Sequence, residues 1–321
     1  MNKLLTALTV TVLQFTCLQP MAQVNIKASK EEAAEQLTRL KGTTTVFFYK
    51  KSRTYSIDSI KQAVTSAWDL TPIIFEDISK ADKYASDPKY SYFSIEGISK
   101  TTTKTTGVTS RNLNTNTHYY LVLRVFKEET KKGKIKTDPL CRIELFPNYE
   151  TMEMATPPDF SNDVFNSEDV VDELYDKGVF YNWSPITMKA MLGAVATDLK
   201  NNERRWVYSN VKAPNLTEVL SADTLYIPQY LLVSYNAWTG KEKEQNENIL
   251  KGYKYKYRVC TDKELYQIFE VEKRGRLLFE YVKSSTDKFV SVYDLKEKKL
   301  IYKRYSPMSY NIKAKDLEAI E

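Results

Sequence analysis

The sequence predicts an α+β protein of two lobes, in which a helix–strand–helix–strand–helix unit followed by antiparallel strands occurs twice. Three observations lead to this prediction. Apolar residues recur at helical spacing in some segments and form short β-branched or aromatic runs in others. Toward the end of each half, several strand-like runs follow one another without a helix between them. Residues 64–84 and 249–268 share one order of features, which predicts an internal duplication; two unrelated domains with a common element order are the alternative.

The first lobe is predicted to span residues 27–150 and to begin with a helix over 29–40. Ser29 and Glu32 form a capping box there, and Gly42 follows at the position where helices favour a left-handed residue. The remaining predicted elements are a strand at 43–49, a helix after Ser56, a strand at 72–75, a short helix at 79–85, strands at 90–95, 118–126 and 141–146, and exposed connections at 99–117 and 127–138.

The element order of residues 27–150 is similar to that of small envelope-assembly domains. Such domains occur in curli-secretion lipoproteins, in activators of penicillin-binding proteins and at the N-terminus of the Tol translocation protein. The similarity concerns the order of helices and strands, so it transfers no functional residues to this chain.

Residues 151–184 are predicted to be a linker and helical connector, because Pro157 and Pro158 interrupt a stretch that has no clear period. The second lobe is predicted to span residues 185–321 and to open with an amphipathic helix. Its predicted elements are helices at 185–201, 241–250 and 262–270, and strands at 224–227, 231–235, 253–260, 277–282, 289–293 and 300–305.

The N-terminus has the layout of a secretory signal peptide. Lys3 supplies an early positive charge, residues 4–18 form a short apolar run, and small residues follow. Cleavage is predicted after Ala22, so that residues 1–22 are the signal peptide and the product is periplasmic or secreted. A lipid anchor on Cys17 is the alternative. No other stretch approaches the roughly 20 apolar residues of a membrane span, so the sequence predicts no transmembrane segment in the mature chain.

Charge and cysteine content limit the classes of partner and of scaffold. The formal net charge is +6 over 321 residues, which does not resemble a nucleic-acid-binding footprint, so no nucleic-acid partner is expected. Cys141 and Cys260 remain after cleavage. An oxidising compartment would let them form a disulfide if the fold brought them together, and the favoured interpretation is that both are buried thiols.

Most kinds of catalytic site require residues that this chain lacks. Its single histidine, His118, is the only available base for a Ser-His-Asp or Cys-His system, and it is predicted to be an ordinary residue at a strand edge. One histidine and two distant cysteines cannot form the usual zinc site. Gly97 and Gly107 are the closest consecutive glycines, too far apart for a phosphate-binding loop. The sequence therefore predicts no cofactor and no metal.

A catalytic role of carboxylates is harder to exclude. Five of them follow two predicted strands and either line a catalytic cleft or cap helices, and capping is the favoured interpretation. They are Glu76, Asp77, Asp82, Asp262 and Glu264. A second acidic run lacks the glycine and the alternation of a calcium loop and is predicted to be solvated. It consists of Asp159, Asp163, Glu168, Asp169 and Asp172.

The segment KGYKYKYR contains the predicted ligand-binding residues. In a strand, its three tyrosines would lie on one face and its three cations on the other. That arrangement would suit stacking on and charge attraction to an anionic polymer or a sugar. The favoured interpretation is a strand with a packed tyrosine face and a solvated basic face. The candidate residues are Tyr253, Lys254, Tyr255, Lys256, Tyr257 and Arg258.

These observations together predict a non-catalytic exported envelope protein that acts as a binding, scaffold or assembly factor. Its partner would be an envelope protein or a glycan. The alternative is a carbohydrate-active protein, either a glycan-binding module or a glycoside hydrolase that uses carboxylates.

Overall fold

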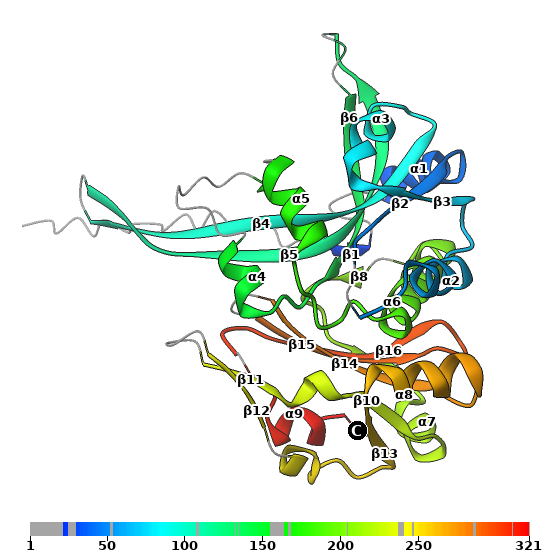
Figure 1. Ribbon diagram of the computed structural model, residues 1–321, viewed down its shortest axis with the longest axis vertical. Helices are drawn as coiled ribbons and strands as arrows, with labels where there is room; N and C mark the ends of the chain where they lie inside the picture. Colours follow the sequence, from blue (N-terminus) through cyan, green and yellow to red (C-terminus); the bar gives the residue numbers. More distant parts are fainter. Residues whose placement is uncertain are drawn as a thin grey trace, which may run out of the picture.

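The computed structural model is built on two large mixed sheets with helices between and around them (Figure 1). It describes residues 22–24, 30–51, 54–106, 109–131, 133, 135–154, 164–165, 168–203, 205–236, 241–245, 247–284, 287–309 and 311–320. Within these residues the chain is α+β, as the sequence predicts. The signal peptide and its cleavage site, apart from Ala22, lie outside the described residues.

The first sheet has the strand order β3-β2-β4-β5-β6-β1-β8, with β7 paired to β4. β2 is parallel to β3 and β4, and the pairs from β4 to β6 and from β6 to β1 are antiparallel. Its strands are β1 (Ala22–Val24), β2 (Thr44–Tyr49), β3 (Ile73–Asp77), β4 (Tyr90–Thr106), β5 (Thr109–Glu129), β6 (Ile135–Glu144), β7 (Val164–Phe165) and β8 (Arg205–Trp206).

The second sheet has the strand order β13-β10-β14-β15-β16-β9. β10 is parallel to β13 and β14, and the later pairs are antiparallel. Its strands are β9 (Val211–Lys212), β10 (Leu225–Pro228), β13 (Tyr257–Cys260), β14 (Leu277–Ser284), β15 (Asp287–Asp294) and β16 (Lys299–Ser306). β11 (Val233–Tyr235) and β12 (Glu242–Glu244) form a separate two-stranded sheet.

The two sheets share a topology over six strands. In chain order β1, β2, β3, β4, β5 and β6 occupy the places that β9, β10, β13, β14, β15 and β16 occupy in the second sheet, with the same directions. The segments between the strands differ, most clearly after β2, where a helix stands in place of the β11–β12 hairpin.

Helices occur at corresponding places in the chain order of the two sheets. The helix before β2 is α1 (Lys30–Lys41), and its counterpart before β10 is α7 (Leu216–Ala222). The helix that begins at Pro185 was predicted to open the second lobe. It precedes β9 and α7 and is additional to the order of elements that the two sheets share. After β3 and β13 lie η1 (Ile78–Lys80) with α3 (Ala81–Ala85) and α8 (Asp262–Tyr266) with the π-helical η4 (Gln267–Val271). The other helical elements are α2 (Ile57–Ala67), α4 (Tyr149–Met154), α5 (Glu168–Asp176), α6 (Pro185–Lys200), η2 (Gln229–Leu232), η3 (Glu247–Leu250) and α9 (Ala314–Glu318).

The central helix α6 joins the two halves of the molecule. It packs against α2 on one side and against β14, β15 and β16 on the other, between the two sheets (Figure 1). The helix is consequently buried almost all round, whereas the sequence predicts a single apolar face. Ser184 caps it by accepting a hydrogen bond from the backbone N–H of Thr187, and Pro185 fills its first turn. One hydrophobic core runs past α6 from Phe47 in the first sheet to Leu278 in the second.

Several predicted boundaries are wrong because strand pairing extends or shortens what the local sequence indicates. Residues 99–106 and 109–117, predicted to be a connection, pair with each other and lengthen the β4–β5 hairpin, which projects to the left in Figure 1. The predicted connection at 127–138 is likewise mostly strand. Residues 241–250 form β12 and η3 in place of a helix. Gly42 does not adopt a positive φ.

The connector between the sheets contains more structure than the sequence indicates. α4 extends into its first residues, β7 pairs with β4, and α5 packs against β4 and η1. Residues 155–163, including Asp159 and Asp163 of the acidic run, lie outside the described residues. No helix in the described ranges is long and apolar enough to cross a membrane.

Candidate functional site

The predicted binding strand at 253–258 is mostly not a strand. β13 begins at Tyr257, because its neighbour β10 begins at Leu225, which pairs with Tyr257. Tyr253 is 7 % exposed and packs in the second core, whereas Tyr257 is 38 % exposed, so the tyrosines do not share one face. The three rings contact each other edge to face, with the centroid of Tyr253 5.7 Å from that of Tyr255 and 6.1 Å from that of Tyr257.

The cations of this segment lie at the surface. Lys254 and Lys256 are exposed, and Arg258 forms an ion pair with Glu264 at 2.7 Å. The structure thus replaces the two-faced strand with a buried ring, a half-buried ring and an exposed ring in succession. Ligand binding by Tyr253, Lys254, Tyr255, Lys256, Tyr257 and Arg258 stays a prediction.

Tyr253 supports a specific prediction about stability. Its hydroxyl oxygen is buried and has no hydrogen-bond partner among the described residues. Removing that hydroxyl abolishes the cost of burying it unpaired, so Tyr253→Phe is expected to raise the free energy of unfolding by about 1 kcal/mol. Tyr257→Phe, at an exposed ring in the same segment, is the matched control and should leave it unchanged. Urea denaturation measures both, and destabilisation by Tyr253→Phe would show that the hydroxyl has a partner.

Three of the five candidate carboxylates have local structural roles. Asp77 caps η1 by accepting a hydrogen bond from the backbone N–H of Ser79 at 3.0 Å. Glu264 forms a capping box with Thr261 at the start of α8. Glu76 accepts hydrogen bonds from Lys80 and Tyr84. Capping therefore accounts for Asp77 and Glu264, as the favoured interpretation states, whereas Glu76 bonds two other side chains.

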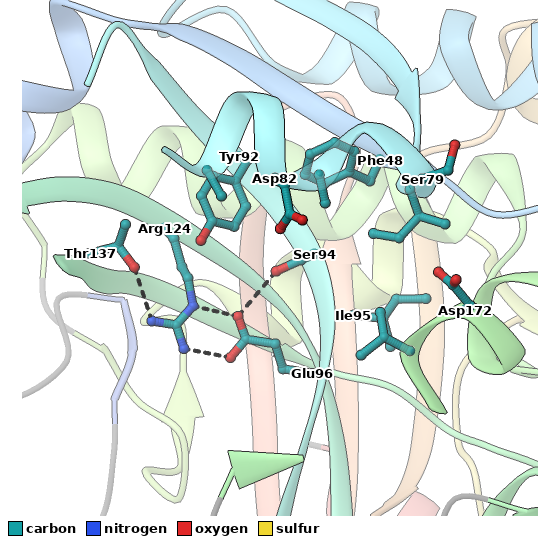
Figure 2. A pocket seen from close by; sticks show the side chains of 14 residues that line it. Phe48, Ser79, Asp82, Tyr92, Ser94, Ile95, Glu96, Arg124, Thr137 and Asp172 are labelled. Atoms are coloured by element: carbon teal, nitrogen blue, oxygen red, sulfur yellow. Dashed lines mark hydrogen bonds and ion pairs between the residues drawn. The ribbon is translucent and has the colours of Figure 1, made fainter. Parts of the chain in front are cut away.

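The other two carboxylates, Asp82 and Asp262, line different cavities and are not brought together. Asp82 lies on the rim of a groove of about 470 Å³ over one face of the first sheet, between α3 and α5 (Figure 2). Asp172 of α5, one of the predicted solvated acids, is on the same rim (Figure 2). Among the described residues, none of the cavities reported in this section is lined by two of the five candidate carboxylates.

The floor of the groove is occupied by an internal ion pair. Arg124 donates to Glu96 through Nε at 2.5 Å and through one terminal nitrogen at 2.7 Å, and its other terminal nitrogen donates to Thr137 (Figure 2). Ser94 donates to the same carboxylate. A bidentate pair of this kind is strong and geometrically fixed. Because the guanidinium and the carboxylate already satisfy each other, the floor offers a ligand few unused polar groups.

A second cavity, which we name the tyrosine cleft, lies between the two halves of the molecule. It encloses about 560 Å³, within the usual range for small-molecule sites. Its lining residues are Lys50, Lys51, Thr54, Tyr55, Glu150, Asp176, Lys177, Gly178, Val179, Phe180, Tyr181, Trp183, Tyr230 and Asp262. A further cavity of about 470 Å³ adjoins it, since Thr54, Tyr181, Tyr230 and Asp262 line both.

Strand ends position the walls of the tyrosine cleft. Lys50 follows the last residue of β2, Tyr230 lies two residues after β10, and Asp262 lies two residues after β13. These three strands belong to the parallel parts of their sheets, and ligands of open parallel sheets bind beyond the carboxyl ends of the strands. Tyr55 donates a hydrogen bond to Asp262 and so connects the two walls.

Aromatic rings cover much of the tyrosine cleft. The rings of Tyr181 and Tyr230 are stacked, with centroids 6.1 Å apart and an angle of 23° between their planes. Trp183 packs against Phe47 and Phe180 and is 3 % exposed. Its indole N–H has no hydrogen-bond partner among the described residues, which is unusual for a group so deeply buried.

The charges around the tyrosine cleft balance. Lys50, Lys51 and Lys177 line it together with three carboxylates, those of Glu150, Asp176 and Asp262. Burial lowers the pKa of Lys50 to about 8, and its ammonium donates to the backbone carbonyls of Lys51 and Tyr175. Burial also raises the pKa of Asp262, although the hydrogen bond from Tyr55 opposes this.

His118, Cys141 and Cys260 are buried and line none of the three cavities. His118 lies inside β5, not at a strand edge, and its Nδ1 is 3.1 Å from the hydroxyl oxygen of Ser284. It is 3 % exposed. Cys141 and Cys260 are free and buried in different sheets, and burial raises the pKa of the Cys141 thiol to about 12. Within the described ranges, no cluster of His, Cys, Asp or Glu could hold a metal ion.

Sequence reasoning missed the aromatic residues of the tyrosine cleft. Tyr181, Trp183 and Tyr230 are far apart from Tyr55 in the chain and belong to no motif. One available signal was that Tyr230 and Asp262 both lie within three residues of the end of a predicted strand. Comparison of the chain with family models, with curated proteins and with solved structures gives no match.

Proposed function

We propose that this chain is an exported, non-catalytic binding protein of the cell envelope and that its ligand occupies the tyrosine cleft. The observation that carries the proposal is a cavity of about 560 Å³ walled by aromatic rings, with an unpartnered buried indole N–H among its lining residues. Aromatic walls with polar groups placed among them are typical of ligand sites. The signal-like N-terminus supports export.

Contacts between the two sheets support a cleft that is formed before any ligand arrives. Asn182, in the segment before α6, bridges them by donating to the backbone carbonyl of Glu144 and to the carboxylate of Glu280 at 3.0 Å, and Lys303 forms a buried ion pair with Glu144 at 3.0 Å. The hydrogen bond from Tyr55 to Asp262 crosses the cleft itself. A pre-organised site loses less conformational entropy on binding, which favours affinity.

A substitution at the rim tests the proposal. Val179 lines the tyrosine cleft and is 47 % exposed, so Val179→Arg should obstruct the entrance without disturbing the core. Val271 is 58 % exposed and is absent from the lining of the cleft, so Val271→Arg is the matched control. The mature chain, immobilised, is exposed to envelope extract of the producing cells. Amide hydrogen exchange at residues 178–183 is followed in parallel with the same extract.

The expected result is that the wild type and Val271→Arg retain the same envelope component and that Val179→Arg loses it. Binding should also slow amide exchange at residues 178–183, which form one wall of the cleft. Equal retention by all three proteins, or protection elsewhere only, would place the binding surface outside the cleft and refute the proposal.

We also propose that export ends with cleavage after Ala22 and without lipidation. The support is the short apolar run 4–18, which lacks a small-residue lipidation box before Cys17. Intact mass and N-terminal sequencing of the envelope-located protein test this. A product that begins at Cys17 and carries acyl groups would contradict it.

We further propose that the two lobes arose by internal duplication. The shared order and direction of six strands in each sheet support this origin. Superposition of the two six-stranded sheets is the test, and equivalent strands that fail to superpose would favour two unrelated units.

A further inference from the structure

We infer that the ligand of the tyrosine cleft is an uncharged oligosaccharide. This inference rests on the proposed binding function and specifies the chemistry of the ligand. Three features of the lining lead to it: its balanced charge, its stacked rings, and the polar groups placed among those rings.

The balance of charge favours a ligand without net charge. Two of the cleft's ammonium groups have anionic neighbours, because Lys177 pairs with Glu173 at 2.9 Å and Lys51 lies 4.0 Å from Asp176. Lys50 is held by two backbone carbonyls. An anionic ligand would have to displace these contacts and would face three carboxylates, and a cationic one would meet three ammonium groups. Neither sign of charge is preferred.

The aromatic walls favour a ligand with flat, weakly polar faces. Tyr181 and Tyr230 stack at 23° and belong to both the tyrosine cleft and the adjoining cavity. The C–H faces of a pyranose ring can cover such ring surfaces and remove them from water, while its hydroxyl groups project from the edges. The hydroxyl of Tyr181 donates to Glu242 at 2.6 Å, which fixes the orientation of its ring.

Hydrogen-bonding groups around the rings match sugar hydroxyls, which both donate and accept. The carboxylates of Glu150 and Asp262 are acceptors, Thr54 can act in both directions, and the indole N–H of Trp183 is a donor without a partner among the described residues. A ligand that brings an oxygen to that N–H gains a hydrogen bond at a group that has already lost its water.

The length of the site favours several linked sugars over one. The tyrosine cleft and the adjoining cavity share four lining residues, so a chain can pass from one into the other. A peptide that binds by strand addition is disfavoured, because that mode requires a free strand edge in the site. The tyrosine cleft is lined instead by residues that follow strands, namely Lys50, Tyr230 and Asp262, and by the segment 176–183.

Isothermal titration of the mature chain with defined probes tests the inference. The saccharides are maltotetraose, cellotetraose and the β-1,4-linked tetramer of N-acetylglucosamine, and the comparators are tetra-alanine and a short polyphosphate. At least one saccharide is expected to bind, with an affinity that does not change between low and high NaCl because no net charge is neutralised. Preference for tetra-alanine or for polyphosphate would overturn the inference.

Three variants locate the binding site and separate the contribution of ring stacking from that of hydrogen-bonding groups. Trp183→Phe keeps a flat ring and removes the N–H, so the affinity should fall about tenfold. Tyr181→Ala removes the stacking face and should weaken binding by about tenfold or more. Tyr181→Phe keeps that face and should stay within about twofold. Thermal melts confirm that each variant is folded, and Trp183→Phe alone suffices if Tyr181→Ala unfolds.

The outcomes distinguish the ligand class from the binding function itself. If Val179→Arg abolishes retention of an envelope component but none of the saccharides binds, the oligosaccharide inference is wrong and the binding function stands. Periodate, which cleaves vicinal diols, should then leave the retained component intact, whereas proteinase should destroy it. If Val179→Arg and Trp183→Phe alter nothing, both proposals are wrong.

Discussion

Replacing Lys288 by methionine is expected to lower the free energy of unfolding by about 4 kcal/mol, because it leaves a buried carboxylate without its counter-ion. Lys288 lies on β15, and its ammonium is 2.5 Å from Asp316 of α9. Both side chains are 1 % exposed. The ammonium also donates to the carbonyl of Asn311, so the pair fastens the C-terminal segment to the second sheet.

Two further variants show whether the loss comes from the unpaired charge. Lys136→Met removes a cation from an exposed pair with Glu128, whose side chains are 56 % and 53 % exposed, and should cost less than about 1 kcal/mol. Lys288→Met combined with Asp316→Leu removes both buried charges and should recover much of the stability. Chemical denaturation measures all of them. A loss for Lys288→Met no larger than that for Lys136→Met would contradict the burial of the pair.

Glu280 should make the stability of this protein fall as the pH rises toward neutrality. The residue is 3 % exposed on β14, and burial raises its pKa to about 7, although hydrogen bonds from Asn182 and Tyr293 oppose the shift. The unfolded chain has an ordinary glutamate, so the folded state binds the proton more tightly. The stabilisation that protonated Glu280 contributes is complete below the pKa of this glutamate in the unfolded chain. It is lost as the pH rises through about 7.

Glu280→Gln removes this titration while keeping the shape of the side chain. The difference in free energy of unfolding between Glu280→Gln and the wild type should increase by about 3 kcal/mol between pH 4.5 and pH 8. Lys283, whose pKa burial lowers to about 7, contributes a dependence of opposite sign at higher pH, and this cancels in the difference. Urea denaturation across this range provides the measurement. The exposed Glu247→Gln is the control, and a constant difference for Glu280→Gln would refute the assignment.

Local sequence signals were sufficient for the fold class and for most elements. The helix at 57–67 was predicted with its cap, Ser56, because helical spacing and a capping side chain act over a few residues. The strands predicted at 277–282, 289–293 and 300–305 correspond to β14, β15 and β16, because β-branched and aromatic runs favour a pleated, half-buried surface. These signals are properties of neighbouring residues, which any fold must respect.

Candidate-site chemistry was predictable only where it is local. The capping roles favoured for Asp77 and Glu264 were confirmed, because a cap involves residues two or three positions apart. The tyrosine cleft was not predicted, since Tyr55, Tyr181, Tyr230 and Asp262 meet only after the two sheets pack around α6. No periodicity in the sequence links residues that are separated by so many positions.

Tertiary pairing also decided where elements end. β13 is limited to Tyr257–Cys260 because its partner β10 has only four residues, which breaks the alternation of tyrosine and lysine over 253–258. The polar residues 99–106 and 109–117 became strand because each segment offers the other a hydrogen-bonding partner. The sequence by itself thus determined the class and the local elements, through propensity, periodicity and caps. Strand length, burial on all sides of α6 and the existence of a cleft depend on distant partners, which only the tertiary structure brings together.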